Sequence, residues 1–240
     1  MTQNRESSAG IVVVIPAYNP PQRFKQLLQE VAAEGLPILV VDDGSDRLEI
    51  ENIQVMLLKH ARRMGKGVAL RSGFDLARQK GFQWAITMDA DFQHLPKDLF
   101  RFINAIKQEK ADIVIGNRFH GGNRVPKARL HANRVSSRLL SQLIGFPVKD
   151  GQSGFRAYKL SLFEDIAPRF NDFSFETEVI IMAVMRGYVL DFVDITVVYY
   201  AGQQARSSFR PVCDTTIISL KSLYRILTER IRRLRKGGPA

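Results

Sequence analysis

Short apolar segments that alternate with helical patterns limit what this chain can fold into. Residues 11–15 form a continuous β-branched run, which is typical of a strand buried on both faces of a parallel sheet. Apolar residues then recur at helical spacing from Phe24 to Val31, and Gly35 is expected to end that helix. The alternation predicts an α/β fold with an open, mostly parallel sheet flanked by helices. Further strands are predicted at 38–41, 55–58, 84–88 and 112–115, with helices over 68–77 and 96–106.

Polar residues collect at the ends of these predicted strands. In an open α/β sheet the ligand site lies at the carboxyl ends of the strands, so side chains that follow different strands meet there. Each residue could instead serve a turn, because Asn, Asp and Gly are common loop formers, but their joint occurrence favours one crevice. The residues at or just beyond a predicted strand end are Tyr18, Asn19, Asp42, Asp43, Lys66, Asp89 and Asp91.

The predicted strand at 84–88 stops at two carboxylates, Asp89 and Asp91, which are separated by one residue. If the strand continued, side-chain alternation would put both on the same side. Carboxylate oxygens suit Mg²⁺ or Mn²⁺, and a site with so few protein ligands leaves coordination positions for phosphate oxygens and water. The pair therefore predicts a metal and diphosphate site, and the alternative is a polar loop entrance.

Composition limits the domain organisation and the class of protein. A chain of 240 residues with 45% hydrophobic residues can bury a substantial core. We expect a disordered N-terminus over 1–10, one domain over 11–200 and a basic C-terminal segment over 201–240. The single Cys213 excludes an internal disulfide framework and a cysteine-based zinc site. No signal-peptide pattern opens the sequence and no apolar stretch approaches the roughly 20 residues that cross a bilayer, so a cytoplasmic protein is expected.

Positive charge is concentrated in two parts of the chain. The formal net charge is +11, and residues 116–145 contain six Lys or Arg and no acid. Residues 201–240 contain nine basic residues and two acids. Two basic blocks on a near-neutral body predict a polyanionic partner, such as phosphates, acidic lipid or nucleic acid. Nucleic acid is the least expected of these, because aromatic residues are not interleaved with the basic runs.

Two common nucleotide-binding motifs are missing. No Gly-x-Gly-x-x-Gly follows the first predicted strand, and Gly65-Lys66-Gly67 lacks the earlier Gly and the Ser or Thr of a phosphate-binding Walker loop. A dinucleotide enzyme and a P-loop enzyme are therefore disfavoured. A phosphatase that uses Asp89 as nucleophile and Asp91 as acid is disfavoured too, because such enzymes usually have Thr or Val where Gln93 stands.

Three segments of the C-terminal half carry further structural expectations. Residues 188–200 are predicted to form a pair of strands or a hairpin. A helix with an apolar face is predicted to begin at 173–178, with Ser174 as a possible cap. Apolar residues from Ile217 to Leu234 recur at helical spacing among basic residues. That last pattern predicts an amphipathic helix, which either lies on an anionic membrane or docks on the body as a terminal helix.

Taken together, the motifs resemble those of the family-two inverting glycosyltransferases of the GT-A fold, and most of all the polyprenyl-phosphate (dolichyl-phosphate-type) sugar synthases. They occur in the family's order across roughly residues 11–200. Asp46 follows Ser45 directly, where the family usually has one residue between, and Arg63 stands where Asn often precedes Gly-x-Gly. The matching pieces are Ile15-Pro16-Ala17-Tyr18-Asn19, Val41-Asp42-Asp43-Gly44-Ser45-Asp46, Gly65-Lys66-Gly67-Val68-Ala69, Asp89-Ala90-Asp91-Phe92-Gln93-His94, Gly116-Asn117-Arg118, and Asp150-Gly151-Gln152-Ser153-Gly154-Phe155-Arg156-Ala157.

The resemblance implies a nucleotide-sugar donor that is bound together with Mg²⁺ or Mn²⁺. Asp89, Asp91 and Gln93 match the metal and diphosphate site, and Asp43 matches the acid that hydrogen-bonds the base. The predicted nucleotide-sugar residues are Pro16, Ala17, Tyr18, Asn19, Asp43, Lys66, Asp89, Ala90, Asp91 and Gln93.

The resemblance also implies a polyprenyl phosphate acceptor, and a peripheral position on the inner face of the membrane in cell-envelope glycan biosynthesis. Arg118 matches a residue that reaches the phosphates. Similar enzymes then present an Arg with a Ser four residues later; this chain offers Arg129 and Asn133, or Arg134 and Ser137 in an alternative register. A phosphomonoester acceptor is ionised near neutral pH and needs cationic residues rather than a strong base.

A hydroxyl acceptor is the alternative, and it requires a general base within hydrogen-bond reach. The candidates are Glu176, Glu178, Asp150 and His120. Both glutamates also have a structural explanation, because acids in the first turn of a helix favour the helix dipole. His94, like His120 and His131, is predicted to be a polar loop or surface residue. The predicted catalytic residues are Asp91, Arg118, Arg129, Glu176 and Glu178.

Overall fold

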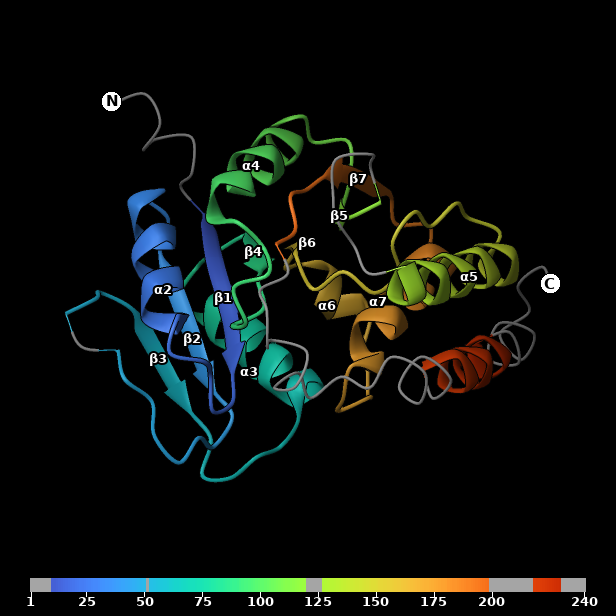
Figure 1. The fold of residues 1–240 in the computed structure, drawn as a ribbon. Coiled ribbons are helices and arrows are strands. Elements are labelled where there is room, and N and C mark those ends of the chain that lie inside the picture. The colour runs from blue at the N-terminus through green and yellow to red at the C-terminus, as the bar shows by residue number, and fades with distance from the viewer. Residues whose placement is uncertain (1–9, 51, 120–126, 199–217, 230–240) are drawn as a thin grey trace.

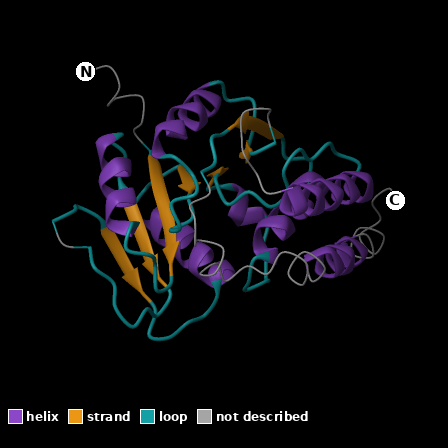
Figure 2. Ribbon diagram, in the orientation of Figure 1, coloured by secondary structure: helices purple, strands orange, loops and turns teal. Residues whose placement is uncertain are grey.

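The structure of the protein is a computed structural model, which describes residues 10–50, 52–119, 127–198 and 218–229. The segment predicted to be a disordered N-terminus lies outside these ranges except for Gly10, as does most of the segment 201–240. Figure 1 shows the elements along the chain, and Figure 2 distinguishes helices from strands. The strands are β1 (Ile11–Ala17), β2 (Ile38–Asp42), β3 (Met56–Lys59), β4 (Trp84–Thr87), β5 (Ile113–Asn117), β6 (Arg156–Lys159) and β7 (Leu190–Asp194). The helices are α2 (Phe24–Ala33), α3 (Lys66–Gln79), η1 (Pro96–Asp98), α4 (Leu99–Lys107), α5 (Lys127–Ile144), α6 (Leu162–Asp165) and α7 (Ser174–Met185).

The seven strands form one sheet in the order β3-β2-β1-β4-β6-β5-β7. Neighbouring strands are parallel except where β6 pairs with β4 and with β5. The predicted open, mostly parallel sheet is confirmed, and the five predicted strands are present within one or two residues at each end. Burial explains the pattern: β1 and β2 lie inside the sheet and are buried along almost their whole length, whereas β3 lies at the edge and alternates between half-buried and exposed residues.

Two apolar cores lie on opposite faces of the sheet. One contains residues of α3, α5 and α7 together with Val12, Val14 and Leu39. The other contains residues of α2 and α4 together with Val13 and Val40, which alternate with the first set along the same strands. Helices therefore cover both faces, and the sheet between them exposes its carboxyl edge to solvent at the cleft described below.

The sequence did not predict that β6 would run antiparallel in the middle of the sheet. The pairs Trp84 with Lys159 and Thr87 with Arg156 fix its register against β4. This direction brings the segment that precedes β6, residues 150–155, to the carboxyl ends of β4 and β5. The motif that begins at Asp150 consequently reaches the same edge as the loops that follow the parallel strands.

The prediction of paired strands or a hairpin over residues 188–200 is wrong for the described residues. Only β7 forms there, and it pairs in parallel with β5 rather than with a neighbouring segment. Val197 then makes an isolated bridge with His94. The alternating pattern therefore indicated a strand and a bridge, but the partners lie far away in sequence.

Helix α7 is buried on all sides instead of along one apolar face, because every residue from Ser174 to Ala183 is buried. Ser174 does not cap it. The carboxylate of Asp172 accepts a hydrogen bond from the backbone N–H of Ser174 at 2.9 Å and performs that role instead. Glu176 and Glu178 are thus placed in the interior of the protein, where each needs a specific partner.

Residues 218–229 form a further helix, named the C-terminal helix below. Its described part confirms the predicted helical pattern. None of the described helices is long and apolar enough to cross a membrane.

Candidate active site

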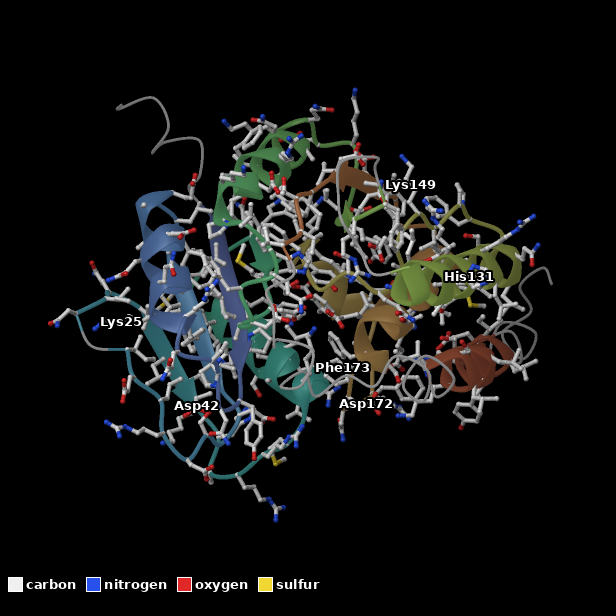
Figure 3. The ribbon with its side chains drawn as sticks, in the orientation of Figure 1. Lys25, Asp42, His131, Lys149, Asp172 and Phe173 are labelled. Atoms are coloured by element: carbon white, nitrogen blue, oxygen red, sulfur yellow. The ribbon has the colours of Figure 1, made fainter. Side chains whose placement is uncertain are left out.

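A cleft of about 310 Å³ opens at the carboxyl edge of the sheet. It gathers side chains that follow β1, β2, β4 and β5, as the strand-end rule predicts. Asp172 and Phe173, labelled in Figure 3, contribute to its wall where α7 begins. All ten predicted nucleotide-sugar residues line it, namely Pro16, Ala17, Tyr18, Asn19, Asp43, Lys66, Asp89, Ala90, Asp91 and Gln93.

Asp43 organises the loop that precedes α3. Its carboxylate accepts hydrogen bonds from the backbone N–H groups of Met64 and Gly65, at 2.8 and 2.7 Å. His60 lies 2.8 Å from the same carboxylate through Nδ1, and its Nε2 is 3.1 Å from the hydroxyl of Ser72. Asp43 therefore lines the cleft and also holds the loop that carries Lys66.

Tyr18 lies at the mouth of the cleft with 39% of its surface exposed. The guanidinium of Arg63 lies 4.4 Å from the centre of its ring, within the range of a cation–π contact. Asn19, with φ of 44°, exchanges two hydrogen bonds of 3.0 Å with Asp46. The two residues that depart from the family pattern, Asp46 and Arg63, thus tie the first loop of the cleft to its neighbours.

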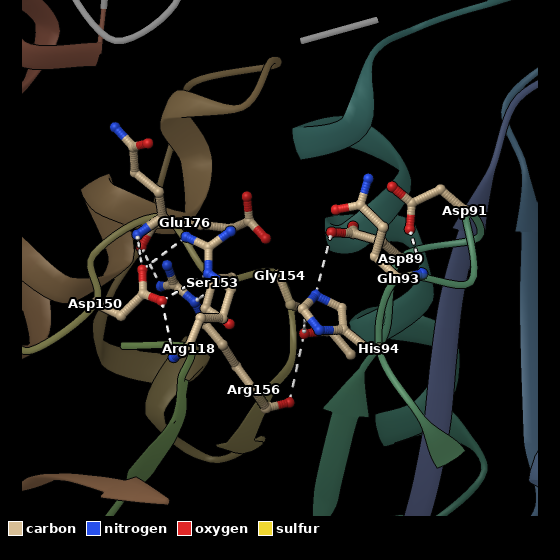
Figure 4. Close-up of polar contacts among 12 residues, drawn as sticks. Asp89, Asp91, Gln93, His94, Arg118, Asp150, Ser153, Gly154, Arg156 and Glu176 are labelled. Carbon is tan, nitrogen blue, oxygen red and sulfur yellow. Dashed lines mark hydrogen bonds and ion pairs between the residues drawn. The ribbon is translucent and has the colours of Figure 1, made fainter. Parts of the chain in front are cut away.

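The two carboxylates that follow β4 lie in a turn, not on a continuing strand. The strand ends at Thr87, and residues 90 and 91 form a turn that leads to Phe92 with φ of 61°. The expectation that strand alternation would align Asp89 and Asp91 is therefore wrong. A carboxylate oxygen of Asp91 accepts a hydrogen bond from the backbone N–H of Gln93 at 3.0 Å, which stabilises the turn. Figure 4 shows Asp89, Asp91 and Gln93 close together.

Lys66 bridges two carboxylates inside the cleft. Its ammonium nitrogen lies 2.6 Å from Oδ1 of Asp89 and 3.0 Å from Oε1 of Glu176. Burial alone lowers the pKa of Lys66, but the two carboxylates outweigh it and hold the pKa above its usual value. Burial likewise raises the pKa of Asp89, and Lys66 and its other neighbours more than reverse the effect. Lys66 and Asp89 are therefore both charged near neutral pH.

The glycines around Lys66 allow α3 to begin directly against another loop. The backbone N–H of Gly67 donates to the carbonyl of Asn171 at 2.8 Å, and a Cβ at Gly67 would overlap the carbonyl oxygen of Phe170. Arg71, one helical turn later, donates to the same Phe170 carbonyl at 2.8 Å. Gly65-Lys66-Gly67 is thus a close-approach motif that fixes Lys66 opposite Glu176.

Asp89 rests against the backbone of Gly154. A Cβ added at Gly154 would lie within 2.8 Å of both carboxylate oxygens of Asp89. Only glycine fits at position 154, because any larger residue would overlap the carboxylate of Asp89 in this position. The antiparallel course of β6 is what brings Gly154 to this place.

We expect Gly154→Ala to lower the activity at least about tenfold, because the new methyl group displaces the Asp89 carboxylate from its position. Unfolding temperature, and steady-state kinetics with the nucleotide-sugar donor that the resemblance implies, check this. The matched control is Gly151→Ala in the same loop, where the methyl group would meet a flexible Leu140 methyl at 3.3 Å. Equal activity of the two variants would show that the position of Asp89 against Gly154 does not matter.

Arg156 is fully buried and hydrogen-bonded to three backbone carbonyls. Its guanidinium donates to the carbonyl oxygens of Ser153, Glu176 and Gly151 at 2.6 to 2.8 Å. It therefore fastens the 150–155 segment to the first turn of α7, and so sets Gly154 relative to Glu176 (Figure 4). Arg156 belongs to the motif that begins at Asp150, and its sequence context predicted no role for it.

The predicted acceptor-side residues are only partly brought together. Arg118 lines the cleft and forms a two-pronged ion pair with the buried Asp150, at 2.6 and 2.8 Å. Asn133 is buried and lines the cleft as well. Ser137 is buried outside the cleft lining, where its hydroxyl accepts a hydrogen bond from the Gly151 N–H at 3.0 Å.

Two other predicted residues are described by the structure and do not line the cleft. Arg134 is exposed on the outer face of α5. Glu178 is 1% exposed and accepts hydrogen bonds from the backbone N–H groups of Arg169 and Phe170, both at 2.8 Å. The backbone of Arg129 belongs to α5, but its side chain lies outside the described residues.

His94 lies in the interior, which differs from the prediction of a polar loop or surface residue. It is 3% exposed rather than a surface residue, with Nε2 3.9 Å from Oδ2 of Asp89 and its ring packed against Phe155. Burial lowers the pKa of His94 to about 4, so the ring is neutral near neutral pH. The sequence feature that could have indicated this position is that His94 lies three residues after Asp91.

The residues at the turn fit a hard divalent cation. No three His, Cys, Asp or Glu side chains within the described ranges are grouped so that they could hold a metal ion. The predicted ligand set is different: the carboxylates of Asp89 and Asp91 and the side-chain amide oxygen of Gln93, all of which line the cleft. These hard oxygen donors suit Mg²⁺ or Mn²⁺, which commonly complete their coordination with phosphate oxygens and water.

Comparison with known proteins gives three consistent findings. Residues 12–167 match the family described as Glycosyl transferase family 2. The chain is 30% identical over 202 residues to a polyprenol monophosphomannose synthase of Mycolicibacterium smegmatis, covering 77% of this chain and 76% of that protein. It is 28% identical to a UDP-N-acetylglucosamine–dolichyl-phosphate N-acetylglucosaminyltransferase of Methanococcus voltae, covering 90% and 94% of the two chains.

The fold has a solved counterpart in mannosyl-3-phosphoglycerate synthase from Rubrobacter xylanophilus. The TM-score is 0.71 at 16% identity, and the match covers 98% of this chain and 78% of that one. At this identity the likeness concerns the arrangement of helices and strands alone. It agrees with the GT-A fold that the motifs implied.

Proposed function

Because the chain belongs to glycosyl transferase family 2 and is a glycosyltransferase, we propose that it moves a sugar from a nucleotide-diphosphate donor to a polyprenyl phosphate, with inversion at the anomeric carbon. The base is uracil or guanine. The observation that carries the proposal is that all ten predicted donor residues share one cleft with Arg118 and Asn133. The names of the two relatives support the choice of a lipid phosphate as acceptor.

The charges in the cleft suit this reaction. Departure of a nucleoside diphosphate builds negative charge on the leaving phosphate, and cationic groups at that point lower the barrier. Asp89, Asp91 and Gln93 would hold Mg²⁺ or Mn²⁺, which when bound would neutralise the diphosphate. Lys66, next to Asp89, supplies a second positive charge on the same side. Arg118, held by Asp150, supplies a positive charge to counter repulsion between the acceptor phosphate and the donor.

The geometry favours a phosphate over a hydroxyl as the attacking group. A phosphate dianion attacks without giving up a proton to the enzyme, whereas an alcohol requires a base. Glu176, which lines the cleft, is engaged in an ion pair with the ammonium group of Lys66 at 3.0 Å, and it could accept a proton from an alcohol only by giving up that pair. Glu178 does not line the cleft, and its carboxylate accepts hydrogen bonds from two backbone N–H groups.

A lipid acceptor implies a position at a membrane. We place the reaction on the cytoplasmic face, where nucleotide sugars are made, and expect an anionic surface because the net charge of the chain is +11. Nucleic acid is not expected as a partner.

Transfer from radiolabelled UDP- and GDP-sugars to polyprenyl phosphate in detergent tests the proposal. We expect a labelled lipid product with one of the donors, formed in the presence of Mg²⁺ or Mn²⁺ and lost with EDTA. The configuration of the new linkage, determined by NMR, tests inversion. Absence of lipid product with every common donor, or product with hydroxyl acceptors alone, would contradict the proposed acceptor.

A further inference from the structure

The C-terminal helix has two faces with different surroundings. Ile218, Ser222, Ile226 and Glu229 are buried on one face, at the spacing of a single helical stripe. Ion pairs fasten this face to the body. Arg225 lies 3.2 Å from Glu178 of α7, and Lys221 pairs with Asp172. The helix is thus docked at the wall of the cleft.

The opposite face of the same helix is apolar and exposed. Leu220, Leu223, Tyr224 and Leu227 are 64%, 42%, 64% and 50% exposed. Their spacing of three, four and seven residues puts them in one stripe, on the side away from the buried one. Four large apolar side chains in one stripe are more than the scattered exposed leucines that a soluble surface normally carries.

Helix α5 presents a related surface. Val135 and Leu139 are 54% and 44% exposed, one helical turn apart, and Arg134 and Arg138 are exposed beside them. Figure 1 shows α5 and the C-terminal helix on the same side of the molecule. Both helices also reach the cleft, α5 through Asn133 and the C-terminal helix through Ile218. Exposed apolar residues therefore lie on the two helices that border the proposed acceptor side.

We propose that the exposed stripe Leu220, Leu223, Tyr224 and Leu227, together with Val135 and Leu139, is the surface by which this protein lies on an anionic lipid bilayer. The inference rests on the proposed function, because a lipid phosphate can enter the cleft while its chain stays in the bilayer only if the cleft opens at the membrane. Leucines enter the boundary between headgroups and acyl chains, and a tyrosine suits the headgroup level.

The basic residues beside the exposed stripe favour a bilayer over another protein as the partner of this surface. Directly after the helix the sequence has five basic residues and no acid, and Arg134 and Arg138 flank the apolar pair of α5. Apolar side chains bordered by Arg and Lys are typical of helices that bind anionic membranes. The proposal therefore commits to anionic lipid.

Co-sedimentation with vesicles tests this surface without any transfer reaction. The full chain is expected to bind vesicles of phosphatidylcholine and phosphatidylglycerol at 3:1, and pure phosphatidylcholine at least about tenfold more weakly. The double variant Leu220→Glu/Leu227→Glu is expected to lose at least about tenfold of the binding to the mixed vesicles. Circular dichroism and the unfolding temperature establish that the variant is folded.

The matched control is Leu57→Glu/Phe100→Glu, which places the same charges on β3 and α4 at residues that are 51% and 48% exposed. It is expected to bind as the wild type does. Equal binding by all three proteins, or an equal loss in both variants, would overturn the proposal. So would a wild-type dimer in sedimentation velocity that Leu220→Glu/Leu227→Glu makes monomeric, because the stripe would then be a contact between two copies.

Different experimental results would contradict the proposed membrane surface and the proposed function. Vesicle binding through the stripe with no sugar transfer to any lipid phosphate would leave the surface standing and remove the acceptor. Transfer to a short-chain acceptor in detergent, with no binding to anionic vesicles, would leave the enzyme standing and remove the surface. Leu220→Glu/Leu227→Glu is expected to keep the detergent activity, because neither leucine lines the cleft.

Discussion

Asp91→Asn is expected to lower the turnover of sugar transfer by roughly 10²–10³-fold, the size of effect that follows loss of one charge-stabilising group in an active site. The carboxylate lines the cleft in the turn after β4, and one oxygen accepts the Gln93 N–H at 3.0 Å. Asn keeps that acceptor oxygen and removes the negative charge. The backbone turn is therefore expected to persist while the affinity for Mg²⁺ or Mn²⁺ falls.

Steady-state kinetics measure the loss of turnover in Asp91→Asn, and calorimetric titration with Mn²⁺ measures the loss of metal affinity. The control is Asp191→Asn on β7, where the carboxylate likewise accepts a hydrogen bond from a backbone N–H nearby in sequence, that of Phe192 at 2.7 Å. The unfolding temperatures of both variants are expected to stay close to that of the wild type. Unchanged turnover in Asp91→Asn would show that the metal assignment is wrong.

Lys66→Met is expected to reduce both stability and activity. It leaves Asp89 and Glu176 facing one another without the ammonium group that now lies 2.6 and 3.0 Å from them. Removing one partner of a buried ion pair costs about 3–5 kcal/mol, and we expect about 3 kcal/mol here because the Asp89 side chain is 30% exposed. Activity should fall at least about 10²-fold, since a positive charge near the diphosphate is lost. Urea unfolding and kinetics measure the two effects.

A second substitution separates the effect on stability from the effect on activity. Lys66→Met/Glu176→Gln removes the more deeply buried of the two carboxylate charges, so part of the lost stability is expected to return while activity stays low. Lys66→Arg keeps the charge and is the conservative control. If Lys66→Met unfolded at the same urea concentration as the wild type, the ion pairs would contribute nothing to stability. Recovery of activity in the double variant would assign Lys66 a purely structural role.

The strand ends were the part of the site that could be predicted from the sequence. Asp43, Lys66 and Asp89 lie in one cleft because parallel strands end at a common edge, and the order of strands need not be known for that. The apolar runs were long enough to identify β1 and β2 unambiguously. Local patterns therefore sufficed to predict that these side chains share one cleft.

The remaining features depend on which distant segments meet, and local patterns carry no such information. Nothing near Arg156 indicates that its strand would run antiparallel between β4 and β5. The pairing of Lys66 with Glu176 joins residues 110 positions apart. His94 was predicted to be a polar loop or surface residue, yet it is buried, with its ring against Phe155 and its backbone in a bridge with Val197. In each case tertiary packing decided what the local sequence left open.

The order of strands divides the sheet into two blocks that are also blocks of sequence. Strands β3, β2, β1 and β4 come from residues before 88, and β6, β5 and β7 come from residues after 112. Within the sheet, the blocks are joined only along a single seam, the antiparallel pairing of β4 with β6. A crossover between two related genes, placed after α4, would thus exchange β5, β6 and β7 as one block, provided that the pairing of β4 with β6 and the contacts of Lys66, Gly67 and Asp89 with the second block are kept.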